Sequence, residues 1–480
     1  MPVADLLPEL VVLIGAVFII LFAAFTPERM QPVAAVIALL VLALATALSV
    51  AQYGGVERLT FSGVWALDRG AVAGKILILV AGAVAVALSP RWMAGDRRHG
   101  EYYGLVLFSL LGAIMLVSAT DTMELVIGLL LSSAASYPLV AFHRSWAPAL
   151  EAGMKYYLMG ALANSLFVIG VVLLFGLTGA TGYPEITRQL SQNADPLVTI
   201  VALSFIFLGL AFKLGAFPIH TWMPDVAQGA PAPIAALLTV APKIAAAIAL
   251  ARFVHILPDT LAWPWVIAML AAVTMTVGNL AALWQDDLRR LLGWSAVSQS
   301  GYALVAITVV GAADSAVPSL LVFLAAYGLA NLAAFATVVH LRGRTALEHY
   351  RGLMGIRPWS ALVVIVAFLS FVGIPPLVGF FGKLMVFKAG IEGGFTWLVI
   401  VAIANTVLSL FYYLRVISIM VFRHPGAEVA CLGRAPGLIA MTAGLLVIVL
   451  GLWAEGLIHP VEGIELLPEL THLLNTRGQS

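Results

Sequence analysis

Charge and cysteine are both scarce in this chain. Only 10% of its 480 residues are charged, whereas 62% are hydrophobic, and the mean hydropathy is +1.04. A soluble globular domain carries about 25% charged residues, so this composition excludes that class and indicates an integral membrane protein. The single cysteine, Cys431, excludes a disulfide framework and a cysteine-ligated metal or iron–sulfur cluster within this chain. The formal charge of +1 gives no indication of nucleic-acid binding.

Apolar runs of about 20 residues, the length that crosses roughly 30 Å of hydrocarbon, recur along the whole sequence. They predict an all-α integral membrane fold with about fourteen transmembrane helices. The acidic start "MPVADLLPEL" runs directly into the first of them, so we expect no separate signal peptide. The predicted spans have their centres near Ala16, Leu42, Leu79, Gly112, Leu131, Val168, Leu208, Ala245, Ala271, Val305, Ala326, Val366, Ile403 and Gly444.

The arginines predict the orientation of these spans, because basic residues in short loops favour the cytoplasmic side. If the N-terminus lies outside, fourteen of the nineteen arginines fall in cytoplasmic loops. The exceptions, in outside loops or in the tail, are Arg58, Arg69, Arg188, Arg252 and Arg477. We therefore predict that both termini lie outside.

The pattern of spans divides the chain into an N-terminal three-helix segment, two five-helix units, and a last span with the C-terminal tail, at residues 1–100, 101–256, 262–425 and 435–480. The fourth span of each five-helix unit is interrupted by proline, at Pro218 and at Pro375 and Pro376, with Lys213 or Lys383 nearby. An odd number of spans inverts the second unit. Inverted repeats with broken helices indicate an ion or substrate path in transporters, whereas the alternative is that these prolines kink buried helices for packing alone.

Lysine is rare and is placed differently from arginine. The six lysines are Lys75, Lys155, Lys213, Lys243, Lys383 and Lys388. A guanidinium keeps its proton at any accessible pH, whereas an ammonium removed from water can lose it, so lysine is the cation able to exchange protons inside a bilayer. Lys213, Lys243 and Lys383 lie within apolar runs, where a charge costs roughly 2.5–3.5 kcal/mol or more. Snorkelling of the side chain to the interface suits Lys388 and Lys75 but not Lys213.

Other polar residues near the first proline break extend this hypothesis. His220 follows Lys213 by seven residues, and we favour a relay from Lys213 through water and His220 to Lys243. Asp225 precedes the eighth span, and we expect it to cap that helix rather than to carry protons. Lys155 is spaced to pair with Glu151 four residues before it.

Several stretches together resemble one family: "LLPEL", "GLAFKLGAFPIHTWMPDVAQGAPAPI", "LRRLLGWSAVSQSGY", "YRGL" and "GIPPLVGFFGKLMVF". They are similar to the antiporter-like membrane subunits of respiratory complex I, and most closely to the subunit N family of the bacterial NADH-quinone oxidoreductases. The resemblance covers essentially the whole chain. Its most specific part is "PDVAQGAPAP" after a lysine-bearing broken helix.

The resemblance implies that lysines matching Lys213, Lys243 and Lys383 pass protons along a hydrophilic axis at mid-membrane, driven by quinone reduction elsewhere in the complex. It implies no cofactor in this chain, with the FMN, iron–sulfur clusters and quinone in partner subunits. It also implies M-like and K-like membrane subunits as neighbours, and a multi-pass position in the bacterial inner (plasma) membrane with both termini on the periplasmic side.

Two departures from the family pattern stand out. The family usually has a glutamate in the fifth span, in a G-x-E-x-x-S pattern, that pairs with the lysine of the seventh; here "GLLLSSAASYPLVAF" places Leu130 there. The nearest carboxylate, Glu124, lies about 9 Å away along a helix and on a different face. An increase in coupled pumping by the variant Leu130→Glu would show that the missing partner of Lys213 limits the present chain. Gln299 occupies a position where many members have histidine, and glutamine orders water but carries no proton.

These features leave three hypotheses. The first is a proton-conducting subunit of a complex I-type NADH-quinone oxidoreductase, with Glu124, Gln299, Lys155 and Asp225 as accessory residues. The second is a subunit of an Mrp-type cation/proton antiporter, which needs no redox partner. The third is a non-pumping structural paralogue that seals the membrane arm, and Leu130 is its main support.

Overall fold

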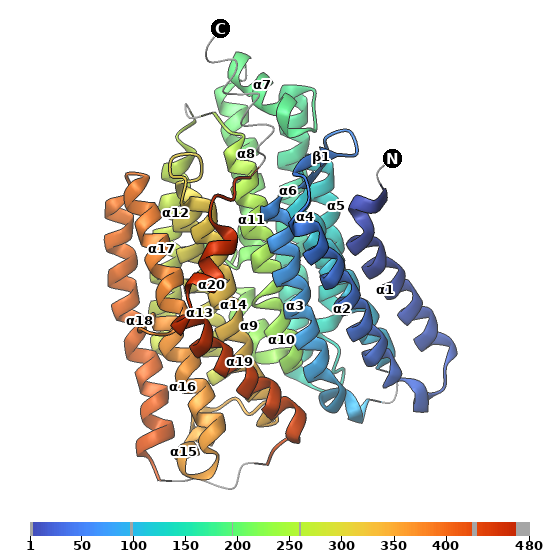
Figure 1. Cartoon of the computed structure of the whole chain (residues 1–480), viewed down its shortest axis with the longest axis vertical. Helices are drawn as coiled ribbons and strands as arrows, with labels where there is room; N and C mark the ends of the chain where they lie inside the picture. The colour runs from blue at the N-terminus through green and yellow to red at the C-terminus, as the bar shows by residue number, and fades with distance from the viewer. Residues whose placement is uncertain (1–2, 97–98, 194, 259–260, 425–429, 467–480) are drawn as a thin grey trace.

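Long helices account for nearly all of the regular structure (Figure 1). The reason is that a backbone crossing hydrocarbon must satisfy its own hydrogen bonds, which an α-helix does within one segment. The computed structural model describes residues 3–96, 99–193, 195–258, 261–424 and 430–466. Arg477 and the end of the predicted 435–480 segment lie outside these ranges. The predicted all-α membrane class is confirmed.

The helices in the first half of the chain are α1 (Leu7–Phe25), α2 (Val33–Tyr53), α3 (Arg69–Trp92), α4 (Gly100–Ser118), α5 (Thr122–Val140), α6 (Ala147–Thr178), α7 (Tyr183–Asn193), α8 (Pro196–Leu214), α9 (Trp222–Gly229), α10 (Ala232–Leu238) and α11 (Ala241–His255). Those in the second half are α12 (Trp263–Leu283), α13 (Leu288–Thr308), α14 (Ala316–His340), α15 (Leu353–Ile356), α16 (Pro358–Val372), α17 (Val378–Glu392), α18 (Thr396–Phe422), α19 (Arg434–Leu452) and α20 (Glu455–Ile458). Short 3₁₀ turns cover residues 3–6, 28–30, 93–95, 347–350 and 459–461.

Each of the fourteen predicted span centres falls in a helix. Within the described residues, 12 helices are long and apolar enough to cross a membrane. Of the two remaining predicted spans, the one around Val305 lies in α13, which is not among the 12, and the one around Val366 lies in α16, which is apolar but has only 15 residues. The number fourteen and the inverted repeat stay predictions.

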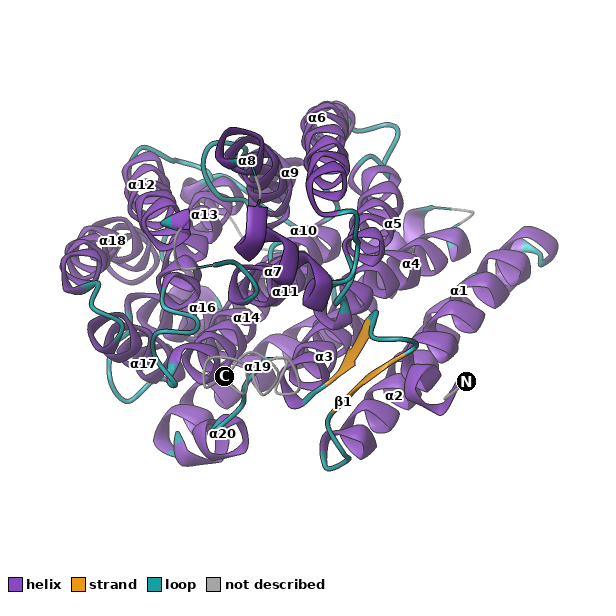
Figure 2. Cartoon of the chain, turned by 90° about the horizontal axis from the view of Figure 1, so that it is seen from above, coloured by secondary structure: helices purple, strands orange, loops and turns teal. Residues whose placement is uncertain are grey.

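Two helical segments form the centre of the bundle. The most apolar window of the segment Ala232–His255, which contains α10 and α11, is buried over its whole length, and that of α14 is 89% buried. Seen from above, these helices are ringed by the others (Figure 2). Because they do not face lipid, their polar residues must find partners inside the protein.

Two elements outside the spans were not predicted. A hairpin of β1 (Arg58–Thr60) and β2 (Trp65–Leu67) joins α2 to α3, turning through residues Phe61, Ser62 and Gly63 with positive φ. The amphipathic helix α7 lies at the same end of the bundle as this hairpin (Figure 1).

A buried ion pair fastens the hairpin end of the bundle. Arg252, which was expected in a loop, is instead fully buried in the last turn of α11, where it donates to both carboxylate oxygens of Asp68 at 2.5 and 3.0 Å. Asp68 also caps α3, because it accepts from the backbone N–H of Ala71 at 2.7 Å. One carboxylate therefore joins two helices of the first half through a bidentate contact.

Replacement of Asp68 by asparagine is expected to destabilise the chain by about 3–5 kcal/mol, because it keeps a cap acceptor but leaves a buried guanidinium without its counter-ion. The measurement is the amount of monodisperse chain that survives heating, followed by size-exclusion chromatography. Glu57→Gln is the control, since Glu57 pairs with Arg69 at the surface and its loss should cost less than about 1 kcal/mol. Equal losses of monodisperse chain in the two variants would contradict a stabilising role for the Asp68–Arg252 ion pair.

Candidate functional site

The first proline break separates α8 from α9 and lies beside Lys213. Gly215 ends α8 in the left-handed conformation with φ +67°, where a side chain would be strained. Pro218 has no N–H, so the carbonyl of Leu214, four residues earlier, has no partner in a continuing helix. Ser300 on α13 donates to that carbonyl at 2.6 Å. The break is therefore satisfied by a side chain from the second half of the chain.

The second break, between α16 and α17, is built in the same way. Gly373 ends α16 with φ +90°, and Pro375 and Pro376 follow it. The carbonyls four residues before these prolines belong to Phe371 and Val372. They accept from Gln299 Nε2 at 3.4 Å and from Lys383 Nζ at 3.3 Å, respectively. The second break thus supplies an acceptor to the lysine that follows it.

A third break was not predicted. The span centred near Ala245 is interrupted at Thr239 and Val240, between α10 and α11, and Lys243 lies in the first turn of α11. The carbonyl of Thr239 accepts from the hydroxyl of Tyr327 at 2.9 Å, and Asn331 donates to its hydroxyl at 2.7 Å. The signal was present in the sequence, because Pro242 in "TVAPK" interrupts an apolar run.

The three lysines proposed to carry protons are buried, with exposed fractions of 0, 0 and 4% for Lys213, Lys243 and Lys383. Lys213 donates to the hydroxyl of Ser132 at 3.3 Å. Lys243 donates to the carbonyl of Ala296. Within the described residues, none of the three amines is paired with a carboxylate. Their partners are neutral oxygen atoms.

Aromatic rings complete the surroundings of two of these amines. The Lys243 amine lies 4.6 Å from the centroid of the Tyr327 ring, and the Lys383 amine lies 4.1 Å from that of Tyr302. Lys383 also donates to Thr406 Oγ1 at 3.3 Å, and this hydroxyl is 3.0 Å from the Tyr302 hydroxyl. The rings and hydroxyls stabilise a positive charge without neutralising it.

Helix α13 connects the three lysine environments. Ser300 donates to Leu214 next to Lys213 and also, at 3.1 Å, to the Ala296 carbonyl that accepts from Lys243. Tyr302, two residues further along, borders Lys383. The sequence analysis predicted this span and singled out Gln299, but it missed Ser300 and Tyr302, although "SAVSQSGY" places several hydroxyl and amide groups in one span.

His220 lies in the first break and is 6% exposed. Its ring packs between Phe217 and Trp294, at centroid distances of 5.8 and 5.5 Å, and its Nδ1 is buried with no hydrogen-bond partner among the described residues. Among the described residues, no hydrogen bond joins His220 to Lys213 or to Lys243. Its place in the relay stays a prediction.

Leu130 does not occupy the position that faces Lys213. Its side chain is 41% exposed, whereas Ser132, which contacts the amine, is fully buried. Two residues are about 200° apart around a helix, so these side chains lie on nearly opposite faces of α5. A glutamate at position 130 would therefore not face Lys213 within this chain. Glu124 lies in the first turn of α5, where it interacts electrostatically with Lys75 and Glu9.

Lys75 does not snorkel. It is fully buried, and its amine lies 2.7 Å from Glu9 Oε1, a contact that joins α1 to α3. Lys388, in contrast, is 68% exposed and lies 3.5 Å from Glu392, as expected for a lysine near the end of a helix. Lys75 therefore differs from Lys213, because its amine contacts a carboxylate whereas that of Lys213 contacts a hydroxyl.

Asp225 does not cap the eighth span. It lies in the first turn of α9, where its carboxylate is 2.5 Å from Arg290 and 3.2 Å from Lys155. Lys155 also makes the predicted pair with Glu151, at 2.7 Å. These charges join α6, α9 and α13 by ion pairs. Arg289, beside this group, is fully buried and donates to carbonyls at the end of α9.

Comparison with known proteins decides the family. Residues 119–409 match the model of the NADH:quinone oxidoreductase/Mrp antiporter transmembrane family. This chain belongs to that family. NADH-quinone oxidoreductase subunit N of Mycobacterium sp. (strain JLS) is 44% identical over 85% of this chain and 87% of its own length. Subunit N 1 of Streptomyces griseus is 40% identical over 94% of this chain and 95% of its own.

Solved structures of antiporter-family proteins have the same fold. A chain of respiratory complex I from Thermus thermophilus is 29% identical and superposes with a TM-score of 0.83, covering 96% of this chain and all of that one. A chain of the Mrp complex from Dietzia sp. has a TM-score of 0.84 over 96% of this chain and 97% of its own, but its 20% identity supports the fold alone. The predicted resemblance to the subunit N family is confirmed.

The geometry around Lys213 changes the expected effect of an added carboxylate in this antiporter-family chain. Leu130→Glu should leave proton translocation by the purified complex near the wild-type value, because the new side chain points outward. Ser132→Asp should lower translocation at neutral pH, because a carboxylate beside Lys213 stabilises the protonated amine and opposes release. The measurement is acidification of proteoliposomes per electron transferred. A larger effect of Leu130→Glu than of Ser132→Asp would refute the assignment of the two faces.

Proposed function

We propose that this chain is a proton-conducting membrane-arm subunit of a complex I-type NADH-quinone oxidoreductase. Its homology to subunit N proteins supports this function, but the observation that carries it is the environment of Lys213, Lys243 and Lys383. Three buried amines contact neutral oxygens, and hydrogen bonds from one helix, α13, connect their surroundings. A carboxylate favours the charged form of a lysine beside it, whereas these neutral oxygens do not, so the three amines can exchange a proton.

The helix breaks and α13 give this exchange a physical route. At the breaks, backbone carbonyls accept hydrogen bonds from side chains, and the Ala296 carbonyl within α13 does so as well. These acceptors allow polar groups at a depth where they are otherwise costly. The unpartnered His220 Nδ1 and Ser298 Oγ are buried next to this route, and buried polar atoms of this kind usually bind water. Protons then pass between amines through hydroxyl groups and bound water in the plane of the membrane.

The redox chemistry belongs to other chains in this proposal. The FMN, iron–sulfur clusters and quinone are in partner subunits, and M-like and K-like membrane subunits flank this one. Within the described residues no group of three histidine, cysteine or carboxylate side chains could hold a metal ion. We place the chain in the bacterial inner membrane with both termini periplasmic, which the distribution of loop arginines supports.

Lys213→Ala and Lys383→Ala are the direct tests. At least one is expected to lower proton translocation per electron by about tenfold or more, because the exchanging amine is lost. Lys383→Arg should fail as well, since a guanidinium keeps the charge but does not release its proton. The matched control is Lys388→Ala on the same helix, α17, because Lys388 is exposed and paired with Glu392.

The measurement is the ratio of protons moved to electrons transferred by the purified complex in proteoliposomes, with subunit content checked by mass spectrometry. Unchanged ratios in both alanine variants would favour a structural subunit that seals the membrane arm. Cation-dependent proton movement without electron transfer would instead favour the antiporter alternative.

Ser300 provides an independent test of the connection through α13. Ser300→Ala removes the donor shared by the Leu214 and Ala296 carbonyls, so translocation should fall severalfold while the folded complex is retained. The control is Thr308→Ala on the same helix, because the Thr308 hydroxyl donates to the Leu304 carbonyl one turn earlier within that helix. If both alanine variants translocate protons equally well, α13 does not connect the lysines.

A further inference from the structure

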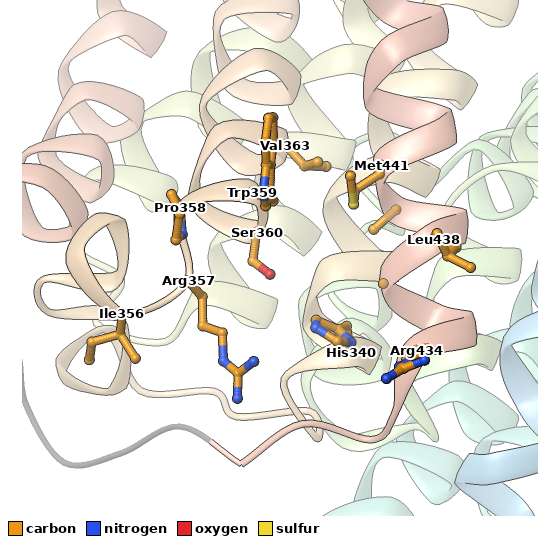
Figure 3. Close-up of a pocket in the computed structure, with 12 residues that line it drawn as sticks. His340, Ile356, Arg357, Pro358, Trp359, Ser360, Val363, Arg434, Leu438 and Met441 are labelled. Carbon is orange, nitrogen blue, oxygen red and sulfur yellow. The ribbon is translucent and has the colours of Figure 1, made fainter.

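A basic pocket opens where α16 and α19 begin. It has a volume of about 380 Å³ and is lined by Arg357, Arg434, His340 and Ser360, among others. Figure 3 shows Arg357 and Arg434 on opposite sides of His340. Both arginines are exposed, and neither forms an ion pair within the described part of the chain. Two arginines without a carboxylate partner, at the ends of two membrane helices, form a site for an anion.

An apolar groove continues from this pocket into the membrane. Its volume is about 450 Å³, and Trp359, Val363, Leu438 and Met441 line both the pocket and the groove. From Leu438 to Ile448 the groove follows α19 for about 15 Å at 1.5 Å per residue. That is half of the roughly 30 Å hydrocarbon core, or the depth of one leaflet.

Glycine residues in α19 bring the walls together. A side chain at Gly437 would lie 2.9 Å from the His340 ring, and one at Gly444 would lie 3.1 Å from Val363. The His340 ring is fixed in addition by a hydrogen bond from Nδ1 to the Gly433 carbonyl at 3.0 Å. The floor of the pocket is thus held in place, whereas the exposed Trp359, Leu438 and Leu445 form an open rim.

We propose that this surface binds one anionic glycerophospholipid, with the phosphate between Arg357 and Arg434 and one acyl chain in the groove. Charge complementarity selects the headgroup, and the length of the groove suits a chain that stays within one leaflet. The exposed Trp359 lies at the border, where its amphipathic ring is favoured. None of the lysines Lys213, Lys243 and Lys383 lines the pocket or the groove, so the proposal does not depend on the proton path.

The experiment uses the purified complex with phosphatidylglycerol that carries a photoreactive diazirine on one acyl chain, and phosphatidylcholine with the same chain. Phosphatidylglycerol should label peptides of α16 and α19 roughly tenfold more than phosphatidylcholine, because two arginines each favour an anionic headgroup. In the double variant R357Q/R434Q this preference should disappear. Labelled peptides are identified by mass spectrometry.

Two further variants separate the possible outcomes. Arg29→Gln removes an exposed arginine in another turn at the same end of the bundle and should keep the preference. Thr442→Trp should fill the groove from its exposed side and reduce labelling by both lipids while leaving the arginines in place. Equal labelling by the two lipids, or equal losses in R29Q and R357Q/R434Q, would overturn the proposal. An unlabelled groove cross-linked to a neighbouring subunit would also overturn it.

Discussion

An ammonium group inside a bilayer needs oxygen acceptors, and a regular helix uses all of its own. This requirement explains why Lys383 lies beside the second break, whose freed carbonyl accepts from its amine. Proline frees the carbonyl four residues before it, and a left-handed glycine ends the preceding helix without strain. Lys383 takes the carbonyl freed by Pro376, and Ser300 takes the one freed by Pro218. The breaks therefore supply carbonyl acceptors in addition to the Ser132 hydroxyl and the Ala296 carbonyl, which lie in regular helices.

The buried cations fall into two chemical classes. Arg252 and Lys75 contact the carboxylates of Asp68 and Glu9, and these pairs join helices of the first half. Lys213, Lys243 and Lys383 contact hydroxyl and carbonyl oxygens instead. A carboxylate partner favours the charged form of a buried cation. Removing that partner costs several kcal/mol. A neutral oxygen can accept from an ammonium and does not fix its protonation state. The partners, rather than burial alone, separate the fastening residues from the proposed proton path.

The sequence was sufficient for the class, for helices at the predicted span centres, for two breaks and for the burial of three lysines, because these depend on local composition. It was not sufficient for the direction in which a side chain faces. Leu130 takes the place of the glutamate in the expected family pattern, yet the packing of α5 turns it outward and presents Ser132 to Lys213. Arg252 and Lys75 were misplaced because their partners are 184 and 66 residues away in the chain. The third break, in contrast, had a visible signal in Pro242.

The polar composition of one long helix, α13, explains why other helices surround it. Helix α13 carries buried serines, glutamine and tyrosine, so exposure of this helix to lipid would leave their polar groups unsatisfied. It is therefore enclosed by α9, α11, α12, α14, α17 and α18, each of which packs against it. Helices at the edge, such as α1, α2 and α19, are apolar and largely exposed. A polar connection between distant lysines can exist in a membrane only when such a ring surrounds it, which requires both halves of the chain.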